Sequence, residues 1–216
     1  MKRRVEQRGR FITLEGGEGV GKTTNLRLIG DILARRGYDV LVTREPGGTP
    51  LAEEIREVLL ARRDEQVTPL AETLLVFAAR AQHVQTVIEP ALADGRWVLC
   101  DRFTDSTFAY QAGGRGLAPA IVEQLAAWVH DARWPDLTLY LDAPAALGMA
   151  RIADRDQDRF EGERTAFFDR VRAVYRERAR SEGRVVEIDA SRPLAYVSED
   201  VAAALDLFLA GVACSA

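Results

Sequence analysis

The sequence predicts an α/β fold in which a five-stranded parallel sheet lies between two layers of helices. Short apolar stretches alternate with longer amphipathic segments along nearly the whole chain, which is the pattern of parallel sheets with both faces covered. A glycine-rich turn directly follows the first apolar stretch. The 216 residues are 47% hydrophobic, and no linker, repeat or low-complexity tract divides them. We therefore expect one domain with a sizeable core.

Five apolar runs predict the strands, and most segments between them have helical periodicity. The expected strands cover residues 11–15, 39–43, 97–101, 137–142 and 185–189. The expected helices cover 24–36, 51–60, 69–94, 118–130, a stretch from Pro144, a stretch that ends near Arg180, and a last helix from Leu194. The helix at 69–94 has the clearest apolar stripe, with spacings of four and three between Leu70, Leu74, Phe77, Ala81, Val84 and Ile88.

Charge and composition exclude several classes of protein. A formal net charge of -4 argues against a nucleic-acid partner, because proteins that bind nucleic acid are normally basic. No apolar run is long enough to span a membrane, and the basic residues at 1–10 lack the apolar stretch of a secretory signal. Two distant cysteines, Cys100 and Cys214, suit a reducing cytoplasm better than a disulfide scaffold or a zinc site. We expect a cytoplasmic domain at 11–210, with a solvated basic tail at 1–10 and a second tail at 211–216.

The glycine-rich turn fits the phosphate-binding pattern G-x-x-x-x-G-K-[ST] in full, between a predicted strand and a predicted helix. Such a turn aims several backbone N–H groups and the positive end of the helix at one point, which suits a polyphosphate. Lys22 adds a mobile positive charge and Thr23 a hydroxyl for Mg²⁺, which a turn that merely needs glycines would not explain. The fold class is therefore that of the three-layer P-loop NTPases. The residues expected to bind ATP here are Gly16, Gly17, Glu18, Gly19, Val20, Gly21, Lys22, Thr23 and Thr24.

Charged residues gather where three predicted strands end and loops begin, in the segments 15–23, 43–49 and 101–115. The carboxyl ends of parallel strands are where such sheets bind ligands. Asp101 follows an apolar strand, as does the carboxylate that serves Mg²⁺ in many P-loop enzymes. Arg44 and Arg102 end two strands beside the phosphate loop, where their planar guanidinium groups suit a monophosphate. Asp101 and Arg102 alone could form a surface ion pair, but two arginines beside the loop favour a second anion site.

These motifs, in this order, resemble those of the bacterial thymidylate kinase family, in the nucleoside-monophosphate kinase group. The resemblance covers nearly everything from Phe11 to about Tyr196, and its most specific part is the Arg-Glu-Pro-Gly-Gly-Thr run at 44–49. It implies phosphoryl transfer from Mg·ATP to dTMP, with dTDP and ADP as products, as a step toward dTTP. The matching segments are 15–24, 43–49, 77–83, 101–103, 106–111, 113–116, 135–142 and 158–161.

The resemblance also implies roles for individual residues. Lys22 and the loop amides hold the ATP phosphates, and Thr23 and Asp101 serve Mg²⁺. Phe77 stacks on thymine and Arg80, three residues later on the same helix face, donates to its carbonyl edge. On periodicity alone, Phe77 would be a core residue instead. The implied dTMP contacts are Glu18, Arg44, Phe77, Arg80, Arg102, Ser106, Thr107, Tyr110 and Gln111.

The charged segment 151–164 has the composition of a mobile lid that excludes water from the site, although a solvated surface would have the same composition. The phosphate loop contains no arginine, so the bacterial family pattern implies that the lid supplies one to the transferring phosphoryl group. Arg155 is the first candidate and Arg159 the second, whereas Arg151 and Arg192 are expected beside the adenine. The expected catalytic residues are Lys22, Arg102, Arg155 and Arg159.

The family resemblance further implies a homodimer formed through helices on one side of the sheet. The helix at 69–94 has a candidate face for it, made of Ala71, Leu75, Ala78 and Gln82. Two other functions are considered. A P-loop kinase of the same fold could use a different monophosphate or small-molecule acceptor. A GTPase-like switch would need an Asn-Lys-x-Asp guanine-reading run, and the sequence contains none.

Overall fold

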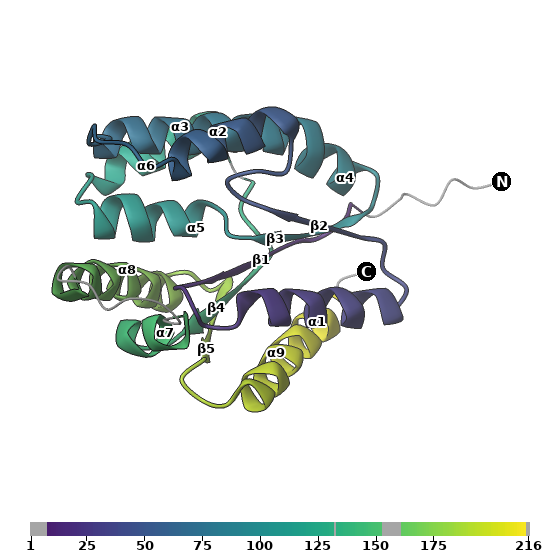
Figure 1. Cartoon of the computed structure of the whole chain (residues 1–216). Helices are drawn as coiled ribbons and strands as arrows, with labels where there is room; N and C mark the ends of the chain where they lie inside the picture. Colours follow the sequence, from purple (N-terminus) through teal and green to yellow (C-terminus); the bar gives the residue numbers. More distant parts are fainter. Residues whose placement is uncertain (1–7, 132, 153–160, 215–216) are drawn as a thin grey trace.

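The computed structural model describes residues 8–131, 133–152 and 161–214 of the chain. Its centre is a single parallel sheet of five strands in the order β2-β3-β1-β4-β5, which confirms the predicted α/β class (Figure 1). The first strand lies in the middle, so the glycine-rich turn after it leaves the sheet at its centre. The strands are β1 (Phe11–Gly16), β2 (Val40–Arg44), β3 (Trp97–Asp101), β4 (Leu137–Asp142) and β5 (Val185–Asp189).

The helices begin where the sequence provides starting residues. Threonine hydroxyls cap two of them, since Thr49 accepts the N–H of Ala52 at 3.1 Å and Thr68 accepts that of Ala71 at 3.3 Å, each just before a proline. The α-helices are α1 (Lys22–Arg35), α2 (Pro50–Leu60), α3 (Pro69–His83), α4 (Glu89–Ala93), α5 (Thr104–Thr107), α6 (Pro119–Val129), α7 (Ala145–Ile152), α8 (Glu161–Ser181) and α9 (Leu194–Cys214). Two π-helical segments, η1 (Val84–Ile88) and η2 (Phe108–Gly114), continue α3 and α5.

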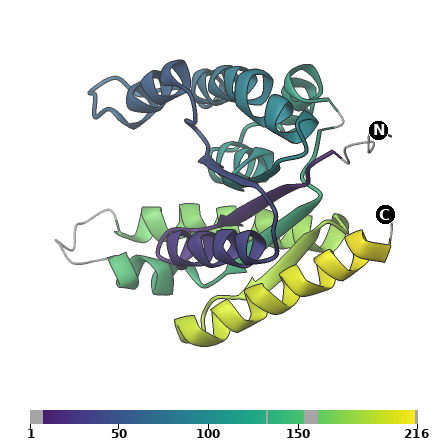
Figure 2. The same cartoon turned by 90° about the vertical axis from the view of Figure 1, so that its right-hand side faces the viewer.

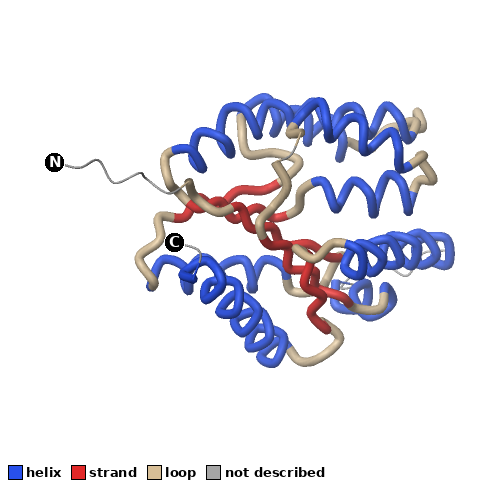
Figure 3. The backbone as a smooth tube through the Cα atoms, turned by 180° about the vertical axis from the view of Figure 1, so that it is seen from behind, coloured by secondary structure: helices blue, strands red, loops and turns tan. Residues whose placement is uncertain are grey.

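Helices cover both faces of the sheet (Figures 2 and 3). Alternate residues of a strand point to opposite faces. Helices α1 and α9 pack on one face, where Leu14, Leu99 and Leu139 join the largest apolar cluster. On the other face, η1 and α4 cover Val98 and Cys100 of β3, and α8 covers Tyr140 of β4. This second face also holds the buried polar residues of β1 and β4, so it is the chemically richer side.

The segment after β3 differs from the prediction. The sequence analysis predicts a strand end and a loop at residues 101–115, but the structure forms a helix from Thr104 to Gly114. Its threonines and paired glycines are weak helix formers, so packing on α8 has to stabilise it. A Cβ atom at Gly113 would lie only 2.6 Å from Cγ2 of Val174, which shows how closely the two helices approach. The glycines there permit contact and do not end the helix.

Three further differences concern the ends of elements. Leu70 and Leu74 are 46% and 49% exposed, so only the later part of the predicted stripe faces the core. Helix α9 continues to Cys214, past the expected domain end at 210. Residues 8–10 of the basic tail are packed, since Arg8 pairs with Glu89 at 2.6 Å and the Gly9 N–H donates to the Leu92 carbonyl at 2.9 Å. None of the described helices is long and apolar enough to cross a membrane.

Candidate active site

The phosphate-binding loop joins β1 to α1 at the carboxyl edge of the sheet. Gly19 and Gly21 have φ angles of +68° and +87°, which L side chains rarely adopt. A Cβ atom at Gly19 would overlap the backbone carbonyl of Gly148, so the loop and α7 meet backbone to backbone. The Lys22 ammonium folds back over the loop and donates to the carbonyl oxygens of Gly16, at 3.2 Å, and Gly17.

Several charges surround Lys22. Burial and the positive charge of Arg102 lower the pKa of the Lys22 ammonium to about 7, and Asp101 partly opposes this shift. Oδ1 of Asp101 is buried and has no hydrogen-bond partner among the described residues. An unsatisfied carboxylate oxygen is the kind of ligand that Mg²⁺ prefers. The described residues contain no group of three or more His, Cys, Asp or Glu that could hold a metal by themselves. A metal here would need ligands from bound phosphates as well.

Arg102 is constrained in both its backbone and its side chain. Its φ angle is +70°, a left-handed conformation that is uncommon for a residue with a side chain. Its N–H donates to the Leu14 carbonyl at 3.0 Å, and Nη1 donates to Ser106 Oγ at 3.2 Å. The guanidinium carbon lies 4.9 Å from the centroid of the Tyr110 ring. Backbone and side chain are thus both held, in agreement with a fixed anion-binding role.

Glu15 is a site residue that the sequence analysis missed. Its fully buried carboxylate accepts three hydrogen bonds, from the Phe103 N–H at 2.7 Å, Ser106 Oγ at 2.6 Å and the Tyr175 hydroxyl at 2.8 Å. Burial, with Asp105 nearby, raises the pKa of Glu15 to about 7. A carboxylate at the end of an apolar strand was a signal in the sequence, because a buried acid needs a specific reason to be there.

The expected acceptor-phosphate arginines differ in their surroundings. Arg44 and Asp101 are paired in register between β2 and β3, so Arg44 and Arg102 end neighbouring strands as predicted. The Arg44 side chain is 55% exposed, and Glu53 of α2 holds its Nη2 at 2.8 Å. Glu53 also accepts the Gly48 N–H at 3.0 Å, so α2 ties this arginine to the loop after β2.

The residues expected around the base form a second group, between α3 and the α5–η2 helix. Arg80 is buried, and its Nη1 donates to Thr107 Oγ1 at 3.1 Å. Phe77 is 2% exposed and packs in an apolar cluster with Phe108, so it is a core residue in this structure and its stacking on a base stays a prediction. Nε2 of Gln111 donates to Glu72 at 2.8 Å, a partner that the sequence analysis did not single out.

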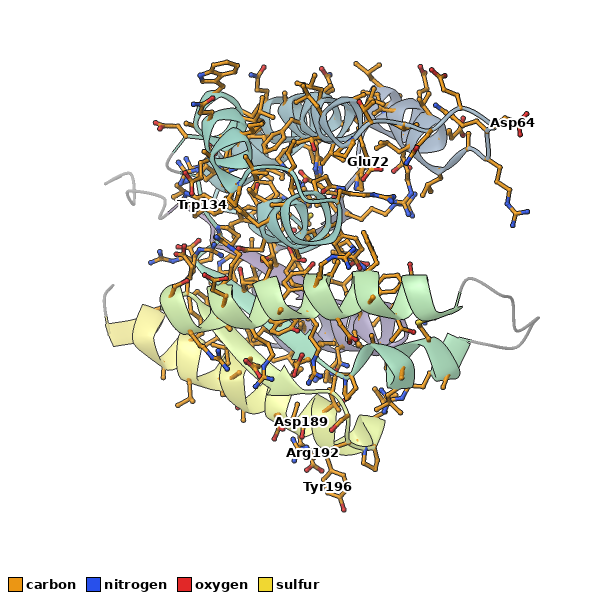
Figure 4. All side chains as sticks on the ribbon, turned by 90° about the vertical axis from the view of Figure 1, so that its left-hand side faces the viewer. Asp64, Glu72, Trp134, Asp189, Arg192 and Tyr196 are labelled. Atoms are coloured by element: carbon orange, nitrogen blue, oxygen red, sulfur yellow. The ribbon has the colours of Figure 1, made fainter. Side chains whose placement is uncertain are left out.

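The residues expected beside the adenine lie apart from the others. Figure 4 looks onto the carboxyl edge of the sheet, where Arg192 and Tyr196 lie near the start of α9 and Glu72 lies in the opposite half of the molecule. Nη1 of Arg151 donates to the Ala190 carbonyl at 2.9 Å, and Nη2 donates to that of Ser191 at 3.2 Å, so α7 is tied to the loop before α9. Arg155 and Arg159 lie outside the described residues.

A phosphate-binding loop at the centre of a parallel sheet, with Lys22, Asp101 and Arg102 beside it, defines a P-loop phosphotransferase. The family model "Thymidylate kinase" matches residues 14–201. The chain is 55% identical to the thymidylate kinase of Teredinibacter turnerae, across 93% of this chain and 99% of that protein. It is 53% identical to that of Methylococcus capsulatus, across 94% and 98%, and 54% identical to that of Bordetella pertussis, across 88% and 91%. The chain belongs to the thymidylate kinase family.

Proposed function

We propose that this chain transfers the γ-phosphoryl group of Mg·ATP to dTMP and releases dTDP and ADP, a step in the synthesis of dTTP. The observation that carries the proposal is the meeting of Lys22, which begins α1 after the phosphate loop, with Asp101 and Arg102 at the end of β3, the strand beside β1. A kinase of this fold with another acceptor is disfavoured by identities of 53–55% to proteins named thymidylate kinase.

ATP binds at the phosphate loop in this proposal. The loop amides and Lys22 hold its β- and γ-phosphates, and the Lys22 ammonium leaves the Gly16 and Gly17 carbonyls to do so. Thr23 and Asp101 would hold Mg²⁺ together with phosphate oxygens. The metal would neutralise charge on the phosphates and orient them. The adenine lies beside Arg151 and the loop that ends in Arg192.

The acceptor lies on the other side of the phosphate loop. Arg44 and Arg102 hold the dTMP phosphate, with Glu18 on the side of the sugar and phosphate. Arg80 and Phe77 contact the base, and Ser106, Thr107, Tyr110 and Gln111 contact the rest of the nucleoside. Because both substrates are anions, these cations reduce their repulsion and set the two phosphates in line. Direct transfer follows, without a covalent intermediate on the protein.

The same proposal includes a homodimer and a cytoplasmic location. Large apolar side chains are exposed on three helices that form one outer side of the molecule, α2, α3 and α6 (Figure 1). They include Leu51 at 49%, Leu70 at 46%, Leu74 at 49% and Trp128 at 80%. Such a patch on one side favours a protein partner, and a second copy satisfies it by symmetry. The free, buried thiol of Cys100 suits a reducing compartment.

The proposal is tested by measuring ADP release with Mg·ATP and a panel of acceptors. We expect dTMP to be the best acceptor. The acceptor dUMP should be poorer because it lacks the methyl group, but still detectable because it keeps the carbonyl. The acceptor dCMP should be at least roughly tenfold worse than dTMP. Cytosine places an amine where thymine has a carbonyl, and leaving the buried Arg80 donor unpaired costs about 1–3 kcal/mol. A best acceptor other than dTMP would overturn the proposal.

A further inference from the structure

A buried chain of polar side chains connects the end of β2 to Arg80 on α3. Nε of Arg80 donates to Glu45 Oε2 at 2.6 Å, and Glu45 Oε1 lies 3.1 Å from His83 Nδ1. Nε2 of His83 lies 2.8 Å from Thr43 Oγ1. The side chains of Arg80, Glu45 and His83 are 1%, 3% and 0% exposed. Bound dTMP could therefore contact only an edge of the Arg80 guanidinium. It could not contact Glu45 or His83, because both side chains are buried.

The three side chains hold one another in a fixed arrangement. A carboxylate accepts but does not donate, so Glu45 selects the His83 tautomer with the proton on Nδ1, which leaves Nε2 to accept the Thr43 hydroxyl. Burial raises the pKa of Glu45, but Arg80 and His83 outweigh it and hold the value below its usual range, so the carboxylate is charged. Gly48 makes room for the imidazole, because a Cβ atom at that position would overlap it.

The guanidinium of Arg80 is thereby set in one orientation. Glu45 holds Nε and Thr107 holds Nη1, while the planar group lies 4.7 Å from the Phe77 ring centroid and 5.0 Å from that of Phe103. Within the described part of the chain, Nη2 makes no hydrogen bond. A planar group that is held at two nitrogens and contacts two aromatic rings presents its third nitrogen in one direction.

We propose that Glu45 and His83 are positioning residues for base selection: they hold Arg80 so that Nη2 donates to the carbonyl of thymine and meets a donor on cytosine. This inference rests on the proposed function, since it takes Arg80 as the residue that contacts the base. It adds that discrimination against cytosine depends on two residues that never touch the acceptor. Residues 44–49 thus serve the base as well as the phosphate.

Two variants separate positioning from a general structural role. Glu45→Gln keeps the shape and one acceptor oxygen but loses the charge, and His83→Asn keeps an amide donor toward Glu45 but loses the contact with Thr43. In each we expect the ratio of kcat/KM for dTMP over dCMP to fall roughly tenfold, because a hydrogen bond that fixes the buried Glu45 carboxylate or the Arg80 guanidinium is weakened or lost. The ratio for dTMP over dUMP should stay unchanged, because both bases carry the carbonyl. The KM for ATP should also stay unchanged.

Glu89→Gln is the matched control, because it removes a carboxylate that pairs with Arg8 and Arg133 at the far end of the same helical stretch. It should leave both ratios as in the wild type. Arg80→Gln should abolish discrimination against dCMP; if it does not, the proposed role of Arg80 is wrong. If Arg80→Gln abolishes it but Glu45→Gln and His83→Asn do not change it, the positioning inference alone is overturned. A parallel fall of both ratios would mean general distortion and would overturn it too. Should Glu45→Gln fail to fold, His83→Asn decides.

Discussion

The carboxylate of Glu15 accepts the backbone N–H of Phe103 at 2.7 Å and thereby fixes the chain immediately after Arg102. Arg102 has a φ angle of +70°, and such a conformation persists only where the surroundings determine it. The same carboxylate accepts a hydrogen bond from the Ser106 hydroxyl, and that hydroxyl in turn accepts one from the Arg102 guanidinium. The last residue before the glycine-rich loop therefore shapes the anion site on the neighbouring strand.

The first prediction concerns Glu15 and pH. Its pKa rises from 4.5 to about 7 on folding, so between these values the folded state binds more protons than the unfolded state. Stability from this group is therefore present below pH 4.5 and is lost as pH rises through 7. Glu15→Gln removes this pH-dependent loss. From pH 5 to pH 8, the difference in unfolding free energy between the variant and the wild type should therefore shift in favour of the variant by up to about 3 kcal/mol.

Urea unfolding of both proteins at the two pH values measures this gain. Glu89→Gln serves as the control, since Arg8 and Arg133 hold the pKa of Glu89 below its usual value despite partial burial, and its contribution is constant over this range. An equal difference between Glu15→Gln and the wild type at pH 5 and pH 8 would contradict the prediction.

The second prediction is that Lys22→Ala lowers kcat by roughly 10²–10³ while the fold stays intact. The lysine acts on phosphate charge, and among the described residues its ammonium donates hydrogen bonds only to carbonyls of its own loop. A coupled assay of ADP release measures the loss, and circular dichroism checks the fold. Arg27→Ala removes an exposed cation from the same helix and should have no effect. Near-normal activity of Lys22→Ala would be incompatible with the proposed ATP site.

The third prediction tests the lid arginines. Arg155→Ala or Arg159→Ala should lower kcat sharply, by up to about 10³-fold if either residue acts like an arginine finger, with little change in dTMP affinity. Steady-state kinetics with both substrates varied separates the two effects. Arg180→Ala, an exposed position on α8, is the control. If both single variants and the double variant keep the wild-type kcat, the charged segment has no catalytic part.

The fourth prediction concerns the exposed apolar side of α2, α3 and α6. The wild type should have the mass of a dimer by light scattering, and Leu74→Glu should dissociate it, because a buried unpaired carboxylate is costly at an apolar interface. Leu207→Glu changes a residue that is 77% exposed on α9, which lies on the other side of the sheet, and should remain dimeric. A monomeric wild type at micromolar concentration would rule out the dimer.

The fifth prediction concerns the close approach of the phosphate loop to α7. Gly19→Ala adds a Cβ atom that would overlap the Gly148 carbonyl at a φ of +68°, so the loop must move. We expect the KM for ATP to rise and the protein to lose about 1–3 kcal/mol of stability. Gly17→Ala is the matched control, because its Cβ would have only an ordinary contact of 4.0 Å with Val20. Equal effects of the two substitutions would contradict this explanation.

Local patterns in the sequence were enough to predict the α/β class, the five strands within one residue at each end, and the position of the phosphate loop. These depend on local patterns, which are apolar runs of strand length and a motif whose chemistry lies in consecutive residues. It also indicated that Arg44 and Arg102 lie together, because parallel strands end at one edge.

The contacts that hold those side chains became visible only in the folded chain. Glu15 and Tyr175 are 160 residues apart, and Glu45 and His83 are 38 apart, so no periodicity could pair them. The helix at Thr104 to Gly114 forms despite weak local propensity because α8 packs on it. Likewise, Leu70 and Leu74 have the pattern of core residues, but which side of α3 is covered depends on its neighbours in space. Burial and long-range pairing are properties of the folded chain, and local sequence patterns do not contain them.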